Sequence, residues 1–381
     1  GEALEFNILA YMAPGMAMMF LMFAVTYGAR SLLVENQAGT LPRMLVAPTS
    51  SASVLGGKFA GVFLTAVAQL TILIGGTSLL FSLQWGDTLG VIVNTGDDFE
   101  HLGLHVSPDI DTVVYTLAGL ANPDTGWGRR DESWSFMAAL GALGGPTWFR
   151  LGDGDLAMHV ERTRRLAAGE PLSAIVCDLA RRLGIAARIV PMTDARLRTR
   201  VLSDEGAIDF QDYFVRRQCG PRVRGIAFDG APACRPAPGV NELLRDPALG
   251  AIVICPSNPY LSIDPILAVP GLRESLRAAR VPVVAVSPLI AGAAVKGPTA
   301  KIMAELGRPI GADEVARHYD DLIDGFVLDV RDAALAATIG VPVRLTDTLM
   351  KTPDDRRRVA LECLRLAHDL AHGPSKEPSN D

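Results

Sequence analysis

Five acidic side chains and two histidines crowd into VNTGDDFEHLGLHVSPDIDT, the stretch from Val93 to Thr112 that follows a short apolar run. Two pairs of aspartates stand out: Asp97 with Asp98, and Asp109 with Asp111. Carboxylates that converge at the end of a strand repel one another unless a cation lies between them, and hard oxygen ligands favour Mg²⁺. The spacing therefore predicts a magnesium site, although a solvated loop or a helix N-terminus capped by aspartates would explain the same residues without a ligand.

Two later loops carry polar residues where an apolar run ends, and ligands of open α/β sheets bind beyond the carboxyl ends of the strands. The run ICPSNPYLSIDPIL presents Ser257 and Asn258 between prolines, in a turn suited to a phosphate or a base edge. The run SPLIAGAAVKGPTAKIMAEL places Gly292, Lys296 and Lys301 before or within a helix start, which favours an anion. This second run does not match the P-loop pattern, so by spacing alone it is a weak motif.

A third loop, GGPTWFRLGDGDLAMHVERTRRL, combines aromatic, acidic and histidine residues. Trp148 and Phe149 are suited to packing against a flat ring. Asp153, Asp155 and His159 are expected near one face of a helix start, where Asp153 would serve equally well as a helix cap.

The elements that would position these loops are visible from Asp87 onward. The apolar runs GVIVN, AARIVPM, GAIVIC, VPVVAVS, DGFVLDV and VPVRLTD mostly alternate with helix-like stretches. Such alternation predicts an α/β fold with a mostly parallel, Rossmann-like sheet and helices on both faces. A final helix is expected from Thr352 as N-cap with Pro353 at its first position, followed by a disordered tail, GPSKEPSND.

Bulk properties narrow the class of protein. The 381 residues suffice for two or three domains, and the net charge of −6 argues against a nucleic-acid binder. The five cysteines lack CxxC spacing, so neither a zinc site nor a disulfide framework is predicted, and a reducing cytosol is the expected compartment.

The N-terminal part has a different composition. Residues 6–29 and 59–86 contain no charged residue, and their lengths of 24 and 28 exceed the roughly 20 residues that cross a membrane. Both are predicted transmembrane helices, and the basic loop between them is expected in the cytoplasm. The run ENQAGTLPRMLVAPTSSASVLGGKFAGV in this part resembles ABC-2 type transporter permeases. The predicted domains are a permease-like fragment (1–87), a soluble domain (88–350), and a C-terminal helix with its tail (351–381).

The soluble part resembles the 2-phospho-L-lactate transferase family of coenzyme F420 biosynthesis. The resemblance runs from about residue 90 to 346 and rests on VNTGDDFEHLGLHVSPDIDTVVYTLAGLANPDTGWG, GGPTWFRLGDGDLAMH, DFQDYFVRRQC, VICPSNPYLSI, VSPLIAGAAVKGP and HYDDLIDGFVLD. It implies that the hydroxyl of the deazaflavin FO attacks a lactyl or enolpyruvyl diphosphoguanosine and releases GMP with the help of Mg²⁺. It also implies a cytoplasmic transferase domain. The expected assembly is either a monomer or a homodimer.

The resemblance assigns roles to matching positions. Asp97 and Asp98 would be catalytic, and the metal would be held by Asp97 and Asp111, with Asp98 and Asp109 as alternates. The substrate-binding residues implied are Asn94, Thr95, Trp127 and Trp148 near the deazaflavin, and Ser257, Asn258 and Lys296 near guanosine diphosphate.

The chain departs from the family pattern in three places. The first strand with its GGxGGAK-like turn is expected to be missing, and Gly154 and Met158 stand where GDRDLATH has arginine and threonine. These departures place catalytic competence in question. Two alternative functions are compatible with parts of the same sequence. One is an ABC-2 transporter subunit with a soluble appendage and a partner ATPase, and the other is a nucleotide-binding regulator of the related gluconeogenesis-factor family.

Overall fold

The computed structural model describes residues 89–122, 128–295 and 297–373. The chain divides into two compact units, Gly1–Thr88 and Leu89–Asp381, and every described residue belongs to the second unit. The predicted membrane spans, 6–29 and 59–86, lie outside the described residues. Within the described ranges, no helix is both long enough and apolar enough to cross a membrane.

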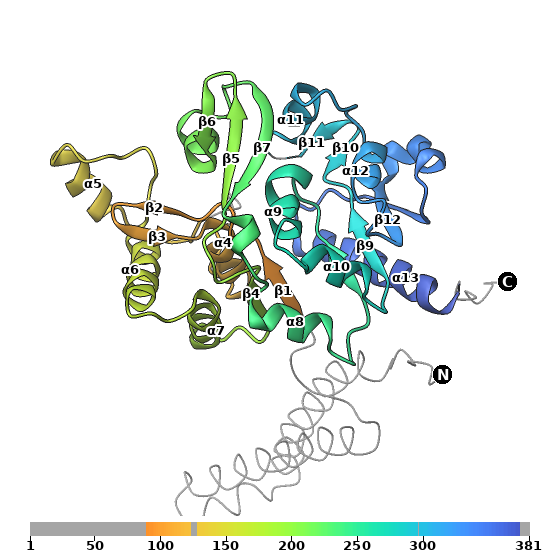
Figure 1. Cartoon of the computed structure of the whole chain (residues 1–381), viewed down its shortest axis with the longest axis horizontal. Helices are drawn as coiled ribbons and strands as arrows, with labels where there is room; N and C mark the ends of the chain where they lie inside the picture. The colour runs from red at the N-terminus through yellow and green to blue at the C-terminus, as the bar shows by residue number, and fades with distance from the viewer. Residues whose placement is uncertain (1–88, 123–127, 296, 374–381) are drawn as a thin grey trace, which may run out of the picture. The chain divides into compact units, whose positions relative to one another are not determined.

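A parallel sheet of four strands, in the order β13-β12-β9-β8, forms the C-terminal half of the second unit (Figure 1). Its strands are β8 (Ile252–Ile254), β9 (Val283–Val286), β12 (Gly325–Asp329) and β13 (Val343–Thr346). Every residue of β9 and β12 is buried, as expected for central strands that are covered on both faces and therefore read as unbroken apolar runs. The predicted parallel α/β sheet is confirmed for this half.

A second pair of parallel strands carries the acidic stretch. Strand β1 (Gly90–Val93) pairs with β4 (Arg188–Pro191), and Val93 lies opposite Pro191. The chain between the two strands forms four helices: α4 (Pro108–Leu117), α5 (Ser135–Ala142), α6 (Asp153–Ala167) and α7 (Leu172–Arg182). Side chains of α4, including Ile110 and Val114, pack with Val93 in one buried cluster. This pair is hydrogen-bonded separately from the four-stranded sheet.

An antiparallel sheet in the order β6-β5-β7 was not predicted. Its strands are β5 (Arg198–Ser203), β6 (Gly206–Asp209) and β7 (Val223–Asp229). In β5, Thr199 and Val201 are buried whereas Arg198 and Arg200 are partly exposed. A half-exposed strand alternates polar and apolar residues, so a search for continuous apolar runs overlooks it.

Short hairpins, turns and helices complete the described part of the chain. The hairpins are β2 (Phe99–His101) with β3 (Leu104–Val106), and β10 (Leu289–Ile290) with β11 (Ala293–Ala294). The remaining α-helices are α8 (Pro238–Leu244), α9 (Asp264–Leu267), α10 (Leu272–Arg277), α11 (Thr299–Glu305), α12 (Ala312–His318) and α13 (Pro353–His372). Two π-helical turns, η1 (Asp212–Arg216) and η3 (Pro259–Ile263), and two 3₁₀ segments, η2 (Ala231–Ala233) and η4 (Val330–Thr338), connect them.

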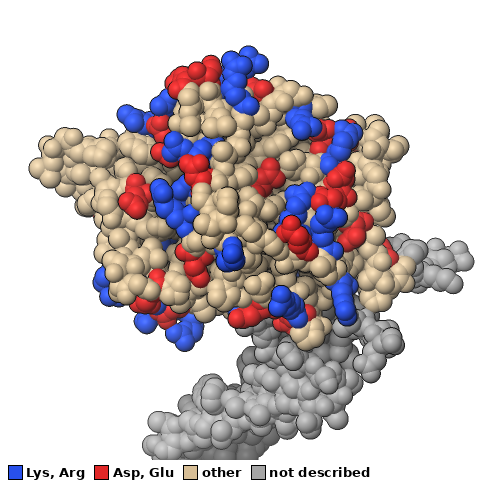
Figure 2. All heavy atoms as spheres, in the orientation of Figure 1, with Lys and Arg blue, Asp and Glu red and all other residues tan. Residues whose placement is uncertain are grey.

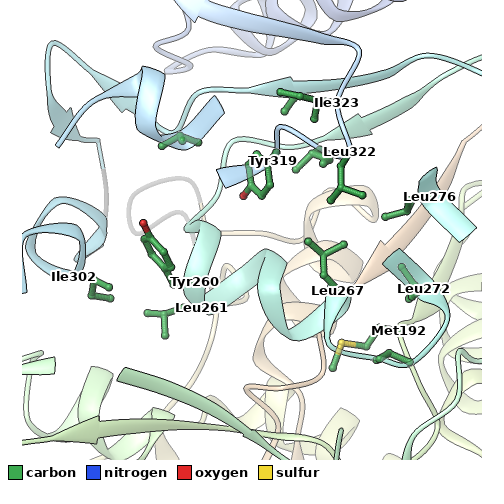
Figure 3. Close-up of a cluster of buried hydrophobic side chains, with 14 of the residues drawn as sticks. Met192, Tyr260, Leu261, Leu267, Leu272, Leu276, Ile302, Tyr319, Leu322 and Ile323 are labelled. Atoms are coloured by element: carbon green, nitrogen blue, oxygen red, sulfur yellow. The ribbon is translucent and has the colours of Figure 1, made fainter. Parts of the chain in front are cut away.

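The four-stranded sheet is buried on both faces by helices. On one face, α9 and α10 contribute Leu267 and Leu272 to a large cluster that also contains Tyr319 (Figure 3). On the other face, α13 packs Cys363 and Leu366 against valines of β9 and β12. Successive strand residues point to opposite faces, which is why these strands are apolar at every position. Helices on both faces of the sheet were predicted, and the structure confirms them here.

Charged side chains of both signs are intermingled on the face drawn in Figure 2. The α5 region at the left edge of that view carries none, in keeping with the charge-free run WSFMAALGALGGPTWF. Leu143 at the end of α5 is 87% exposed. This projecting segment therefore presents a charge-free surface in this view.

The C-terminal helix begins as predicted. The Thr352 hydroxyl accepts a hydrogen bond from the Asp355 amide at 3.2 Å, and the Asp355 carboxylate accepts one from the Thr352 amide at 2.8 Å. This reciprocal capping box supplies partners to two amides that the helix leaves unbonded. We expect Thr352→Ala to lower the free energy of unfolding by about 1 kcal/mol in urea titrations. Lys351→Ala is the matched control, and an equal effect of both substitutions would contradict the capping role.

Candidate active site

The acidic loop, defined here as residues 94–98, leaves the carboxyl end of β1 and is buried along its whole length. Asp97 and Asp98 are 5% and 2% exposed. Burying a carboxylate costs free energy unless it finds a proton, a hydrogen-bond donor or a cation. The partners of each carboxylate therefore show what the site can bind.

Residues far along the chain hold the acidic loop in place. The Thr199 amide on β5 donates to the Gly96 carbonyl at 2.8 Å, and the Gln211 side chain donates to the Asp97 carbonyl at 3.3 Å. Gln211 immediately precedes the π-helical turn η1, and such turns are often found at functional sites. Neither contact has a local signal in the sequence, because both donors come from the unpredicted antiparallel sheet or its edge.

Asn94 joins three elements. Its Oδ1 accepts from the Gly96 amide at 2.7 Å, and its Nδ2 donates to Asp109 Oδ2 at 3.0 Å. The same Nδ2 lies 3.5 Å from the carbonyl oxygen of Leu261, which belongs to η3 in the connection that follows β8. Asn94 therefore brings the loop after β1 and the loop after β8 together, although they are 167 residues apart at this contact.

Asp98 has partners on one oxygen only. Its Oδ2 accepts from the Ser107 hydroxyl at 2.8 Å and lies 3.0 Å from His105 Nε2. Its Oδ1 is buried without a hydrogen-bond partner. One oxygen of this carboxylate is thus fixed by the β2–β3 hairpin and the residue after it, and the other is available to a ligand.

Asp97 and Asp109 form the most strongly perturbed acidic pair of the site. Burial, and then the negative charge of Asp109, raise the pKa of Asp97 well above its ordinary value. Burial also raises the pKa of Asp109 to about 6. Asp97 Oδ1 has no hydrogen-bond partner, so this pair offers oxygen ligands whose mutual repulsion a divalent cation would relieve.

Asp111, predicted as a metal ligand, is paired with an arginine of α6. Both of its oxygens accept hydrogen bonds from the guanidinium of Arg162 on α6, one of them at 3.1 Å. His159 Nδ1 lies 3.6 Å from Asp111 Oδ2, and His159 Nε2 lies 3.2 Å from Asp155 Oδ2. The negative charge of Asp109 acts on Asp97, whereas Asp111 is held in an ion pair with Arg162. Sequence reasoning missed Arg162 because the run ERTRRL reads as an ordinary charged helix face.

The residues expected near guanosine diphosphate are only partly accounted for. Asn258 caps η3, since its Oδ1 accepts from the amides of Tyr260 and Leu261 at 3.0 and 3.1 Å. Its Nδ2 is buried and without a hydrogen-bond partner, so only this amide group is left for a ligand. Ser257 is partly buried immediately before it. Lys296 lies outside the described residues.

Trp148 belongs to a cluster of four rings, two on the hairpin that follows the acidic loop and two in the loop before α6. It packs edge-on against His101 with ring centroids 5.2 Å apart, and Phe99 and Phe149 complete the cluster. His101 Nε2 is buried without a hydrogen-bond partner. The cluster places aromatic surface directly beyond Asp98 in the chain. Trp127, the other predicted aromatic residue, lies outside the described ranges.

The raised pKa of Asp109 predicts how stability depends on pH. The folded state holds this proton more tightly than the unfolded chain does, so the stabilisation is fully present below about pH 4 and is lost as the pH rises through about 6. Asp109→Asn keeps an oxygen that accepts the hydrogen bond from Asn94. Because the asparagine side chain does not ionise, the variant does not lose stability as the pH rises. In urea unfolding with EDTA at about pH 8, we expect the variant to exceed wild type by about 1–3 kcal/mol.

Asp131→Asn, at an exposed aspartate, serves as the control for this pH experiment. Parallel pH profiles of wild type and Asp109→Asn would contradict the assignment of the raised pKa to Asp109.

Gly96 is required by close packing. A Cβ at this position would lie 2.6 Å from Thr199 Oγ1 and 3.0 Å from Pro265 Cβ, closer than real Cβ atoms tolerate without a shift. We expect Gly96→Ala to lower the free energy of unfolding by about 1–3 kcal/mol, because the loop or β5 must move. In Gly250→Ala the new Cβ meets no atom within 4 Å. Indistinguishable melting of both variants would show that the acidic loop is less tightly packed than described.

Comparison with known proteins identifies relatives across most of the chain. A family model described as 2-phospho-L-lactate transferase CofD matches residues 54–346. A phosphoenolpyruvate transferase from Kitasatospora aureofaciens is 41% identical over 304 residues, covering 77% of this chain and 94% of that protein. A 2-phospho-L-lactate transferase from Methanopyrus kandleri is 41% identical over 311 residues, covering 79% and 98%. A solved protein of the UPF0052 family from Bacillus halodurans aligns with a TM-score of 0.47 and 13% identity, covering 72% of this chain and 90% of that chain.

These matches change the predicted organisation of the N-terminal part. The family match starts at residue 54, so it includes the VLGGK run and the predicted span 59–86, and the expected start near residue 90 was too late. The resemblance of residues 1–87 to a permease finds no support in these comparisons. The absence of the family's first strand concerns residues outside the described ranges and stays a prediction.

Proposed function

Because the chain belongs to the 2-phospho-L-lactate transferase CofD family, we propose that it transfers a phospholactyl or phosphoenolpyruvyl group to the deazaflavin FO in coenzyme F420 biosynthesis. The donor is the corresponding diphosphoguanosine. A bond forms between the FO hydroxyl oxygen and the distal phosphorus of the donor, the bond from that phosphorus to the oxygen of GMP breaks, and GMP leaves. The hydroxyl proton passes to a carboxylate. A cytoplasmic location, where guanosine nucleotides are found, accompanies this proposal.

The relatives carry names that correspond to two different donors. Relatives at 41% identity carry the name phosphoenolpyruvate transferase in one case and 2-phospho-L-lactate transferase in the other. The two donors differ only in the three-carbon acid, so identity across the whole chain does not discriminate between them. Turnover must therefore be measured with each of the two donors.

One observation carries the proposal: the loop after β1 buries two carboxylate oxygens without hydrogen-bond partners, and the same loop contacts the loop after β8. Asp97 Oδ1 and Asp98 Oδ1 are buried and unbonded, and Asn94 links this loop to the Leu261 carbonyl. In α/β folds the ends of parallel strands are where phosphorylated ligands bind. A diphosphate held in this position would have the acids on one side and the Asn258 turn on the other.

The oxygen donors fit Mg²⁺, with Asp97 and Asp109 as the residues that would hold it. Both are acids with raised pKa, which a divalent cation would allow to ionise together. When bound, Mg²⁺ supplies neutralisation of the charge that develops on the diphosphate oxygens during phosphoryl transfer. Asn94 orients Asp109 by its hydrogen bond, which gives Asn94 a positioning role in this proposal.

Asp98 is the residue proposed to take the proton of the FO hydroxyl. Its Oδ1 is free, while Ser107 and His105 hold Oδ2 and so fix the direction in which Oδ1 points. A positioned carboxylate within reach of the attacking hydroxyl acts as a general base. Thr95 Oγ1, buried without a partner, and Trp148 are the adjacent groups proposed to contact the deazaflavin.

The test is product formation by the purified full chain with FO and each donor in turn, followed as GMP release and as mass of the product. We expect turnover that requires Mg²⁺ and is abolished by EDTA. Asp97→Asn and Asp98→Asn are expected to lower kcat/KM by about 100-fold or more, since each removes a charged group at the reacting centre.

Glu100→Gln is the matched control, because Glu100 is an exposed acid on the neighbouring strand β2. Absence of FO-dependent GMP release with both donors in the presence of Mg²⁺ would overturn the proposed function.

A further inference from the structure

Four carboxylates share one small region, and they differ in what satisfies them. Asp98 has Ser107 and His105, and Asp109 has the Asn94 amide, whereas Asp97 Oδ1 has no hydrogen-bond partner. Asp111 alone is matched by a full positive charge. Its partner Arg162 lies on α6, and its side chain has no exposed surface.

A buried arginine needs a partner that meets the geometry of its guanidinium. Arg162 donates through NH1 and NH2 to the two oxygens of Asp111, which is the bidentate arrangement that arginine and a carboxylate favour. Removing one partner from such a pair leaves an uncompensated buried charge. The pair also fastens α6 to the first turn of α4, the turn that carries Asp109.

Close polar contacts extend this ion pair along α6. Arg162 NH1 lies 3.5 Å from His159 Nδ1, and His159 Nε2 lies 3.2 Å from Asp155 Oδ2. Asp155 Oδ1 accepts from the Tyr115 hydroxyl at 2.6 Å, which returns the network to α4. Two contacts between α4 and α6, one turn of α4 apart, leave that helix little freedom to rotate about its axis.

The helix geometry then separates the two aspartates of α4. Residues two apart on an α-helix point about 200° away from each other, so Asp109 and Asp111 leave α4 in different directions, although their charges still influence each other. We propose that Arg162 is the positioning residue of the metal site: it withdraws Asp111 from metal binding and holds α4 so that Asp109 faces Asn94 and Asp97. This inference rests on the proposed function, because it concerns the Mg²⁺ that the acidic loop is proposed to hold.

A competing arrangement uses the other side of the same helix. Ligand atoms of Asp111, Asp155 and His159 all lie within 4.8 Å of one another, a spacing that could hold a metal ion. Against it, Arg162 already engages both oxygens of Asp111 and would face any cation in that group with a fixed positive charge. We therefore favour Asp97 and Asp109 as ligands, and the experiment separates the two arrangements.

The experiment measures Mn²⁺ affinity by calorimetry, and thermal stability, on the purified full chain and its variants. We expect Asp109→Asn to lose Mn²⁺ binding without losing thermal stability. Arg162→Gln and Asp111→Asn are each expected to melt lower than wild type and to weaken Mn²⁺ binding about 10-fold, the scale found when a residue that orients a metal ligand is lost. Arg164→Gln, on the exposed face of α6, is the matched control.

The double variant Asp111→Asn with Arg162→Gln is the decisive arm. It replaces the ion pair by two amides of similar shape, so we expect stability and Mn²⁺ affinity to return to within a few-fold of wild type. If the double variant melts like wild type and still fails to bind Mn²⁺, then Asp111 is itself a ligand and the inference is wrong. Loss of Mn²⁺ binding in a folded His159→Gln variant would instead place the cation in the competing group.

Two outcomes distinguish this inference from the proposed function. Wild-type chain that binds no Mn²⁺ contradicts the metal of the proposed function and this inference with it. Wild type that binds Mn²⁺ while Arg162→Gln binds equally well contradicts only the positioning role of Arg162.

Discussion

Repulsion between buried carboxylates is the constraint on which the candidate site depends. Four aspartates lie within fifteen residues of sequence, and three of them are at most 5% exposed. In a medium of low polarity such charges cannot coexist without protons, donors or cations. The fold supplies different partners to the four carboxylates. Arg162 pairs with Asp111, and the Ser107 hydroxyl and the His105 imidazole contact one oxygen of Asp98. Asp97 and Asp109 are left to bind protons or a metal ion.

Elements that are distant in the sequence hold the acidic loop in position. The acidic loop is fastened by an amide from β5, by the side chain of Gln211 before η1, and through Asn94 by a carbonyl of η3. Each contact fixes backbone or an amide rather than neutralising a carboxylate. The loop is therefore held rigidly while its acids keep unused oxygens, which is the arrangement expected of a binding site and is costly for a purely structural loop.

Sequence reasoning succeeded where local physics is sufficient. Unbroken apolar runs identify central parallel strands because both faces are covered, and Thr352 with Pro353 identifies the start of α13 because a capping box involves only neighbours in sequence. It failed for the antiparallel sheet, because buried and partly exposed residues alternate at the start of β5 and the strand is therefore not an unbroken apolar run. It also placed the beginning of the family resemblance too late, because an uncharged stretch was interpreted by length and hydropathy alone.

The sequence by itself determined the chemistry that is available: an acidic loop after β1, a proline-bounded Asn258 turn after β8, and the order of motifs typical of the transferase family. Only the tertiary structure decided which acids act together. Asp109 and Asp111 are equivalent by spacing, yet Asp109 accepts a hydrogen bond from Asn94 whereas Asp111 pairs with Arg162, fifty-one residues further along the chain. No local pattern encodes that partnership, because it arises from the packing of α6 against α4.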